Sequence, residues 1–183
     1  MRATIRNPWA ASLLLGAVMA ALIVTPALAA ARYQPDGLIR MATAGVLGYP
    51  SSPFDGPFLG NNIYNATGAH QTAIFTDIGS TGPSFLTFDI SIQNDGSAAD
   101  RFTVKATGAR SQWVVTYSRG TTNITSAVVA GTYRTPLLAP GAIYVIHAKI
   151  YGGVTRLVTI RSIANSTKVD AVKFGFVWSP RPG

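Results

Sequence analysis

Residues 84–93 read SFLTFDISIQ, a stretch in which apolar and polar side chains alternate from Leu86 to Gln93. Successive side chains of a strand point to opposite faces, so this period of two predicts a strand with one buried face. The apolar positions are Leu86, Phe88, Ile90 and Ile92, and the polar positions are Thr87, Asp89, Ser91 and Gln93. Asn94-Asp95-Gly96 tolerate positive φ, so we expect the strand to end there.

The same alternation recurs further along the chain. It predicts strands at 101–107, 112–118, 142–151, 156–163 and 169–178, and we expect the first of these to pair with 84–93. Trp113 falls on the inward face of its strand, and residues 127–130 fit either a helical turn ended by Gly131 or a strand. About seven strands between residues 72 and 178, separated by turn signals and without a long amphipathic helix, predict an all-β, Ig-like β-sandwich.

The composition agrees with an all-β chain and excludes several kinds of site. Charged residues make up 12% of the 183 residues, and the chain has 18 glycines, 11 prolines, no cysteine and no glutamate. The absence of cysteine excludes disulfides, thiolate metal sites and a cysteine nucleophile. With only His70 and His147, a metal site of three histidines is excluded as well.

The first 29 residues have the pattern of a secretory signal peptide. Arg2 and Arg6 precede an apolar stretch at 9–24, and Pro26 then leads into Ala27-Leu28-Ala29. Small residues at both ends of that last triplet predict cleavage after Ala29, and therefore export to the periplasm or the extracellular space. The alternative is an uncleaved membrane anchor, because the run is long enough to span a bilayer. Pro26 and the Ala-x-Ala ending favour cleavage, which would leave residues 30–183 without a membrane segment.

Residues 30–71 do not alternate, and we predict an irregular N-terminal arm ahead of a sandwich domain at 72–183. A strand is expected in this arm only at 38–41, because 48–60 contains three prolines and three glycines. The arm carries four aromatic residues, Tyr49, Phe54, Phe58 and Tyr64. Aromatics on stiff loops bind sugars and proteins, so these four are the predicted ligand- or partner-binding residues. The alternative is that they cover an open edge of the sandwich.

No catalytic, metal-binding or cofactor-binding residue is predicted. A hydrolase would need His70 or His147 beside a serine and an aspartate, and no Gly-x-Ser-x-Gly motif occurs. His147 instead fits a solvated strand position. Asp95-Gly96 suggests a calcium loop, but an EF-hand in that register would begin at Ser91 and end at Phe102, neither of which is a carboxylate. A looser calcium site at Asp95 and Asp100 stays an alternative.

After cleavage at Ala29, thirteen Lys and Arg residues face seven Asp residues, a net charge of about +6. The basic residues are scattered and never form a run of three. They fit the solvated faces of strands, or a salt-sensitive attraction to an anionic polymer of the cell envelope. No aromatic RNA-binding motif is present, so we expect no nucleic-acid partner.

Six short motifs in a fixed order resemble bacterial extracellular Ig-like modules of the CARDB and NPCBM-associated type. The resemblance covers roughly residues 84–178, and the motifs are Ile92–Gly96, Asp100–Val104, Trp113, Leu138–Gly141, Ile163–Thr167 and Asp170–Val172. It implies an Ig-like sandwich that serves as a spacer, adhesion or binding unit, and it brings no catalytic residues. The segment 60–72 lies outside the pattern and suggests a narrower subfamily of exported proteins of unknown function.

The function predicted from these observations is that of a non-enzymatic exported β-sandwich acting as a binding or structural module at the bacterial cell envelope. Its expected partner is an envelope polysaccharide or protein. One alternative is a partner subunit or assembly factor that works by edge-strand addition. The other is a small hydrolase with an unfamiliar site.

Overall fold

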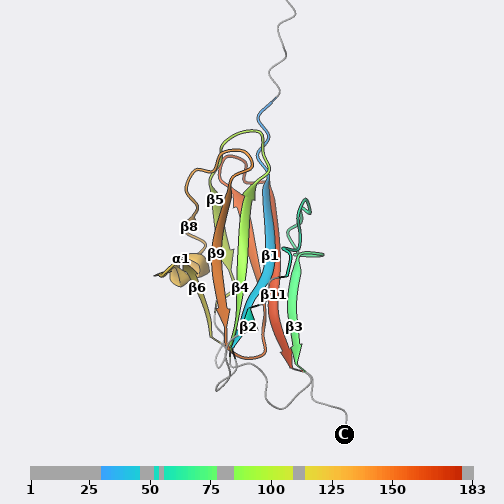
Figure 1. Cartoon of the computed structure of the whole chain (residues 1–183). Coiled ribbons are helices and arrows are strands. Elements are labelled where there is room, and N and C mark those ends of the chain that lie inside the picture. Colours follow the sequence, from blue (N-terminus) through green and yellow to red (C-terminus); the bar gives the residue numbers. More distant parts are fainter. Residues whose placement is uncertain (1–29, 46–51, 54–55, 78–84, 109–113, 179–183) are drawn as a thin grey trace, which may run out of the picture. The chain divides into compact units, whose positions relative to one another are not determined.

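The computed structural model describes residues 30–45, 52–53, 56–77, 85–108 and 114–178. The chain divides into two units, Met1–Ala30 and Ala31–Gly183, and all but one of the first unit's residues lie outside the described ranges. The second unit is an all-β sandwich of two sheets (Figure 1). No helix in the described ranges has the length and hydropathy needed to cross a membrane.

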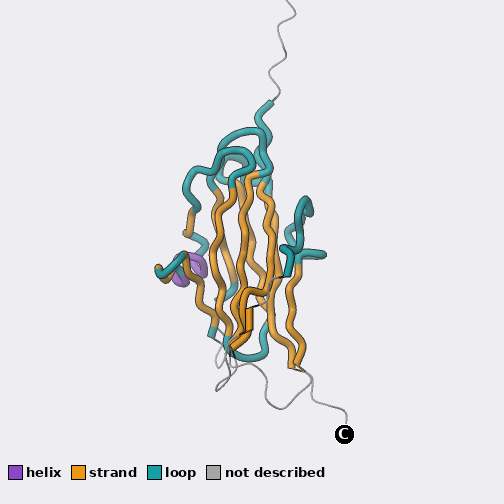
Figure 2. The backbone as a smooth tube through the Cα atoms, in the orientation of Figure 1, coloured by secondary structure: helices purple, strands orange, loops and turns teal. Residues whose placement is uncertain are grey.

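Sheet 1 has six strands and sheet 2 has five. Figure 2 shows the strands in orange and the loops that join them in teal. The strands of sheet 1, in spatial order, are β2 (Ser52–Pro53), β1 (Pro35–Gly45), β4 (Phe85–Asn94), β9 (Ile143–Ile150), β6 (Val115–Arg119) and β7 (Thr122–Asn123). Those of sheet 2 are β3 (Thr72–Asp77), β11 (Val169–Trp178), β10 (Thr155–Ser162), β5 (Phe102–Ala106) and β8 (Tyr133–Arg134). All neighbours are antiparallel except β3 and β11, which are parallel.

The core lies between the sheets, and the predicted inward faces are confirmed wherever they are described. The four side chains of β4 that were predicted to point inward, from Leu86 to Ile92, are at most 1% exposed. Phe88 of sheet 1 packs against Phe174 of sheet 2 with ring centroids 5.0 Å apart, and Tyr117 meets Phe174 edge-on at 6.3 Å. These rings join the two sheets at their centre. The prediction for Trp113 lies outside the described residues.

The prediction that 84–93 pairs with 101–107 is wrong. β4 belongs to sheet 1 and β5 to sheet 2, and residues 95–101 cross between them. Asn94 fixes the start of this crossing, because its side-chain amide donates to the carbonyls of Ala98 at 2.9 Å and Leu138 at 2.8 Å. The turn residues therefore marked the end of the strand correctly, but they carry no information about its partner.

The N-terminal segment contains a longer strand than the four residues expected. β1 pairs with β4 from Pro35 opposite Asn94 to Gly45 opposite Phe85. Its sequence does not alternate because Leu38 and Ile39 are both buried and because the register shifts between Met41 and Thr43. Between residues 72 and 178, where about seven strands were expected, the described residues form nine, β3 to β11, including the two-residue strands β7 and β8. β1 and β2 precede them.

The ambiguous segment near residue 127 is a helix, α1 (Thr125–Ala130). Gly131 ends it in the left-handed conformation, with a φ of 72°. Neither Thr125 nor Ser126 caps its first turn, which begins at Ile124 without a side-chain cap. The Thr125 hydroxyl instead accepts a hydrogen bond from the backbone N–H of Tyr117 at 2.8 Å, which ties α1 to β6.

Truncation of the central ring contact should destabilise the fold far more than loss of a surface charge. Phe88 is fully buried against Phe174, so Phe88→Ala should lower the free energy of unfolding by about 3–5 kcal/mol. Lys105 is exposed, and Lys105→Ala should change it by less than about 0.5 kcal/mol. Urea unfolding of both variants measures the difference, and equal losses would contradict the packing described above.

Candidate functional site

The structure describes two of the four predicted binding aromatics, and they lie at different levels of the sandwich. Phe58 is half-buried, and the Arg40 guanidinium carbon lies 4.6 Å from its ring centroid. Tyr64 is exposed, and its hydroxyl donates to the Asp95 carboxylate at 2.7 Å. Arg40 stands opposite Asp89 on β4. Asp89 precedes Asp95 by six residues, which corresponds to about 20 Å along an extended chain. Phe58 and Tyr64 thus do not form one aromatic site, and Tyr49 and Phe54 lie outside the described residues.

The proline- and glycine-rich segment that carries Phe58 follows the outer edge of β1. Ser52 and Pro53 pair with Ala44 and Thr43, and Leu59 exchanges two backbone hydrogen bonds with Ile39, at 3.0 and 2.8 Å. The described parts of this segment therefore protect the edge of sheet 1. This placement agrees with the interpretation that the segment covers an open edge.

The corresponding edge of sheet 2 is open in the described structure. β3 is the outermost strand of sheet 2 and pairs with β11 alone. The N–H of Lys173 donates to the carbonyl of Gln71 at 2.8 Å, so the backbone groups of Gln71 face β11. Backbone direction alternates along a strand. Thr72, Ile74 and Thr76 therefore present their N–H and C=O groups to the free side, and the Ile74 side chain is 45% exposed.

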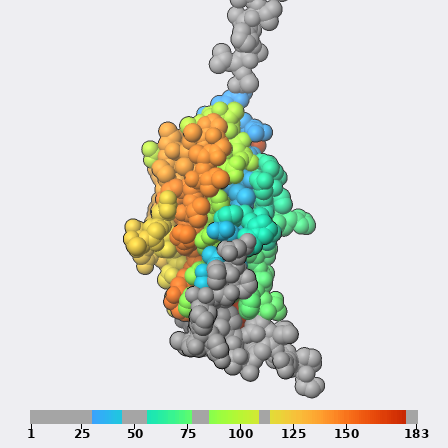
Figure 3. Space-filling model, viewed as in Figure 1, coloured from blue at the N-terminus to red at the C-terminus, as the bar shows by residue number. Residues whose placement is uncertain are grey.

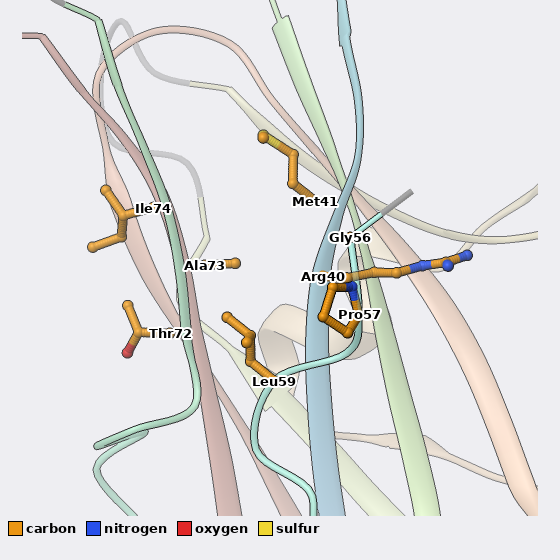
Figure 4. A pocket seen from close by; sticks show the side chains of 8 residues that line it. All are labelled: Arg40, Met41, Gly56, Pro57, Leu59, Thr72, Ala73 and Ile74. Carbon is orange, nitrogen blue, oxygen red and sulfur yellow. The ribbon is translucent and has the colours of Figure 1, made fainter. Parts of the chain in front are cut away.

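A groove of about 300 Å³ lies between the covered edge of sheet 1 and the open edge of sheet 2 (Figure 4). It is lined by Arg40, Met41, Gly56, Pro57, Leu59, Thr72, Ala73 and Ile74. Figure 4 shows the side chains of Leu59 and Ala73 pointing into the space between β1 and β3. Leu59 is 42% exposed, so an apolar wall of the groove is accessible from outside.

A buried polar cluster holds the loop at residues 60–71, which leads into β3. The Asp170 carboxylate of β11 accepts the N–H of Gly37 at 2.6 Å, the N–H of Asn65 at 2.9 Å and the amide of Gln71 at 2.8 Å. The Gln71 amide also donates to the carbonyl of Gly37 at 2.8 Å. Figure 3 shows the loop as the turquoise atoms packed against the rest of the sandwich. The cluster therefore fixes the position of β3 beside the groove.

Asp36 of β1 joins this cluster, and its ionised form is poorly stabilised. One carboxylate oxygen accepts the N–H of Asn62 at 2.9 Å, and the other is buried without a hydrogen-bond partner. Burial, together with the nearby charges of Asp95 and Asp170, raises the pKa of Asp36 to about 7. Burial also raises the pKa of Asp170, although three backbone N–H groups and Gln71 oppose this shift.

The two aspartates of the calcium alternative are engaged with different partners. Asp95 accepts the Tyr64 hydroxyl, whereas Asp100 accepts the Ser162 hydroxyl and the N–H of Ala164. Within the described ranges, no group of three or more histidine or acidic side chains is arranged to hold a metal ion. The geometry therefore lends no support to a calcium site at these residues.

The outer face of sheet 1 carries a cross-strand row that includes His147. Asp89 lies 2.7 Å from Nδ1 of His147 and accepts Nε of Arg40 at 2.9 Å. Ser118 stands opposite His147 on β6, so an aspartate, a histidine and a serine share one row. No hydrogen bond joins Ser118 to His147 among the described residues, and Arg40 shares the charge of Asp89. His70 lies apart, exposed in the loop with a φ of 61°.

Sequence reasoning missed both the open edge of β3 and the cluster at Asp36 and Asp170. The signal for the edge was weak, because Thr72–Asp77 is short and its partner is about a hundred residues away. The cluster had no clear signal either, since Asp36 and Asp170 each stand second in their strand, next to a turn or loop.

No protein-family model matches the chain, and no curated protein matches it. Among solved structures, the chain has a likeness to the secreted serine protease VesC from Vibrio cholerae, with 14% sequence identity and a TM-score of 0.37. The likeness covers 57% of this chain and 21% of that protein, so the chain spans about a fifth of the protease. A match at this level carries no argument about activity. The fold and the site together define a two-sheet β-sandwich in which, among the described residues, the β3 edge is open beside a groove.

The open edge predicts a distinct pattern of amide hydrogen exchange in the protein alone. The N–H groups of Thr72, Ile74 and Thr76 face away from β11 and should exchange rapidly. Those of Ala73 and Phe75 are in the ladder and should exchange more slowly, by at least about tenfold. Nuclear magnetic resonance at single-residue resolution measures this, and uniform protection along β3 would show that the edge is covered.

The buried carboxyl of Asp36 predicts that stability falls as pH rises. Its pKa is about 7 in the folded state against 3.8 for the ordinary group, so the folded state binds more protons between those values. The stabilising effect of the proton is therefore complete below about pH 4 and is lost as pH rises through 7. In the Asp36→Asn variant, the free energy of unfolding should fall less with pH, and at pH 8 it should be higher than that of the parent. Urea unfolding from pH 5 to 8 tests it, with Lys105→Ala as the control that keeps the parent's dependence.

Proposed function

We propose that the chain is a non-enzymatic, exported β-sandwich that acts as a binding module at the bacterial cell envelope. Its binding element is the open edge of β3, where an extended segment of a partner protein adds as a further strand. The observation that carries this proposal is the row of backbone groups that Thr72, Ile74 and Thr76 present on the free side of β3, next to the groove that Thr72 and Ile74 line.

Strand addition needs two features, and the β3 edge supplies both. Main-chain groups give affinity, and spaces for alternate side chains give specificity. The free side of β3 offers the N–H and C=O groups, and the groove lined by Met41, Leu59 and Ala73 offers an apolar space on the inner side. The cluster at Asp170 holds the loop before β3 in place, which lowers the ordering cost of binding.

The non-enzymatic part of the proposal has support of a different kind. In the row at His147, the serine is not hydrogen-bonded to the histidine, and the aspartate is shared with Arg40. Export is the expectation from residues 1–29, and the envelope location follows from export. The resemblance to extracellular Ig-like modules agrees with a binding role.

A backbone variant and a side-chain variant at one position test the proposal. Peptides are selected from a displayed library of random twelve-residue sequences, and the best binder is measured by fluorescence anisotropy. We expect selected peptides to carry apolar residues at every second position. Ile74→Pro removes an N–H that faces outward, so the ladder to β11 survives while affinity falls by at least about tenfold. Ile74→Thr keeps the N–H and should weaken binding less.

Two outcomes would contradict the proposal. Equal affinity of the parent and a folded Ile74→Pro variant would show that the β3 edge takes no strand. Hydrolysis of an ester or peptide by the parent, abolished in both His147→Ala and Ser118→Ala, would place the protein among enzymes. Thermal melting of each variant confirms that it is folded before its affinity or activity is compared.

A further inference from the structure

The topology brings basic residues that are scattered in the sequence onto one face of sheet 2. Lys105 lies on β5, Arg134 on β8, Arg161 on β10 and Lys173 on β11. On β5, β10 and β11 the residues on either side of them are buried in the core, including Val104, Ile160 and Val172. Because side chains alternate, and because Arg134 stands opposite Thr103 on the same face as Lys105, all four point outward.

The register fixes how these four residues are spaced. Thr103 of β5 stands opposite both Arg134 and Arg161, so those two arginines lie in one row, two strands apart. Lys105 lies one step along the same face of β5, opposite Thr159, and Lys173 stands opposite Leu157 on β10. With strands about 4.8 Å apart, the four cations occupy an area about 14 Å wide.

None of the carboxylates whose side chains are described faces this surface. Asp36 and Asp89 belong to sheet 1, and Asp95 and Asp100 lie in the crossing between the sheets. Asp170 is on β11, but its side chain is buried against Gly37. The outer face of sheet 2, as far as it is described, therefore has a single sign of charge.

The cations of the two sheets also differ in what they contact. On sheet 1, Arg40 pairs with Asp89, Lys149 lies 3.9 Å from the ring centroid of Phe85, and Arg119 lies 4.8 Å from that of Tyr144. In the described structure, Lys105, Arg134 and Lys173 have no ion pair, side-chain hydrogen bond or aromatic contact. Charges without protein partners on a one-signed surface attract an anionic partner most strongly.

The other side chains of this face favour a sugar polymer over a nucleic acid. Thr103 and Thr159 place hydroxyl groups between the cations, and Thr155 adds one just beyond Lys173, where they can exchange hydrogen bonds with sugar hydroxyls. A depression of about 300 Å³ opens beside Lys105, lined also by Leu157 and by Val129 of α1. No aromatic residue occupies an outward position of the described strands of sheet 2, so bases would have no stacking partner.

We propose that the outer face of sheet 2 is a binding surface for an anionic polysaccharide, held by Lys105, Arg134, Arg161 and Lys173. The threonine hydroxyls contact its sugars and the cations contact its carboxylates. This surface lies on a sheet face, whereas the peptide site proposed above lies on a strand edge, so the two proposals can fail separately.

The test compares two triple variants with the same loss of charge. Lys105→Thr/Arg134→Thr/Lys173→Thr removes three cations from sheet 2. The matched control, Arg32→Thr/Arg119→Thr/Lys149→Thr, removes three cations from elsewhere. The probe is polygalacturonate, titrated against the residues 30–183 protein from 50 to 300 mM salt. We expect the affinity of the parent to fall as salt rises. The sheet 2 variant should bind about tenfold or more weakly than the parent, and its affinity should depend less on salt. The control should lose no more than about threefold in affinity.

Three results would overturn the proposal. Equal losses in both triple variants would mean that only net charge matters. Tighter binding to a 20-base-pair DNA duplex or to phosphatidylglycerol vesicles than to polygalacturonate would assign the surface to another class of partner. Equal binding of polygalacturonate and neutral dextran would remove the role of charge. Melting of each variant shows that the strands are intact. If charge at position 105 acts, Lys105→Arg should keep the affinity that Lys105→Thr loses.

Discussion

The carboxylate of Asp170 is the contact on which the arrangement of the two sheets depends at one end. It lies on β11 of sheet 2 and accepts hydrogen bonds from Gly37 on β1 of sheet 1 and from Asn65 and Gln71 of the loop before β3. A buried carboxylate without such donors would be strongly destabilising. Both sheets and the loop must therefore be in place together. The contact fixes their relative positions more than it adds to the stability of the fold.

Gly37 shows why this contact needs the residues it has. A Cβ atom at that position would lie 2.7 Å from the Ile160 side chain and 3.2 Å from the Asp170 carboxylate. Only glycine lets β1 approach sheet 2 closely enough for its N–H to reach Asp170. The loop thus fixed positions the open edge of β3 beside the groove, so the proposed peptide site rests on a buried polar contact some distance from it.

Much of the fold could be predicted from the sequence, because local alternation reports burial directly. The inward faces of β4, β5, β9, β10 and β11 follow from period two, and the end of α1 follows from Gly131, which adopts a positive φ. The end of β4 follows from Asn94, whose side chain hydrogen-bonds to the backbone. Strand partners could not be predicted, since Asn94 ends a strand in the same way whether the chain reverses or crosses to another sheet. β1 was underestimated because Leu38 and Ile39 are both buried, which removes the alternation. The candidate sites depend on residues distant in sequence, such as Asp36 with Asp170 and Lys105 with Lys173, and only the topology brings these together.

The parallel pairing of β3 with β11 also determines when sheet 2 is completed during folding. Thr72 stands opposite Lys173, so the pairing joins residues about a hundred positions apart. Contacts of such long sequence separation are made late, because the chain between them must be ordered first. β3 has no partner in sheet 2 until β11 is available, and the loop at 60–71 has no anchor until Asp170 arrives with it. Sheet 2 therefore stays incomplete, with β3 and the loop before it unanchored, until the residues of β11 are present.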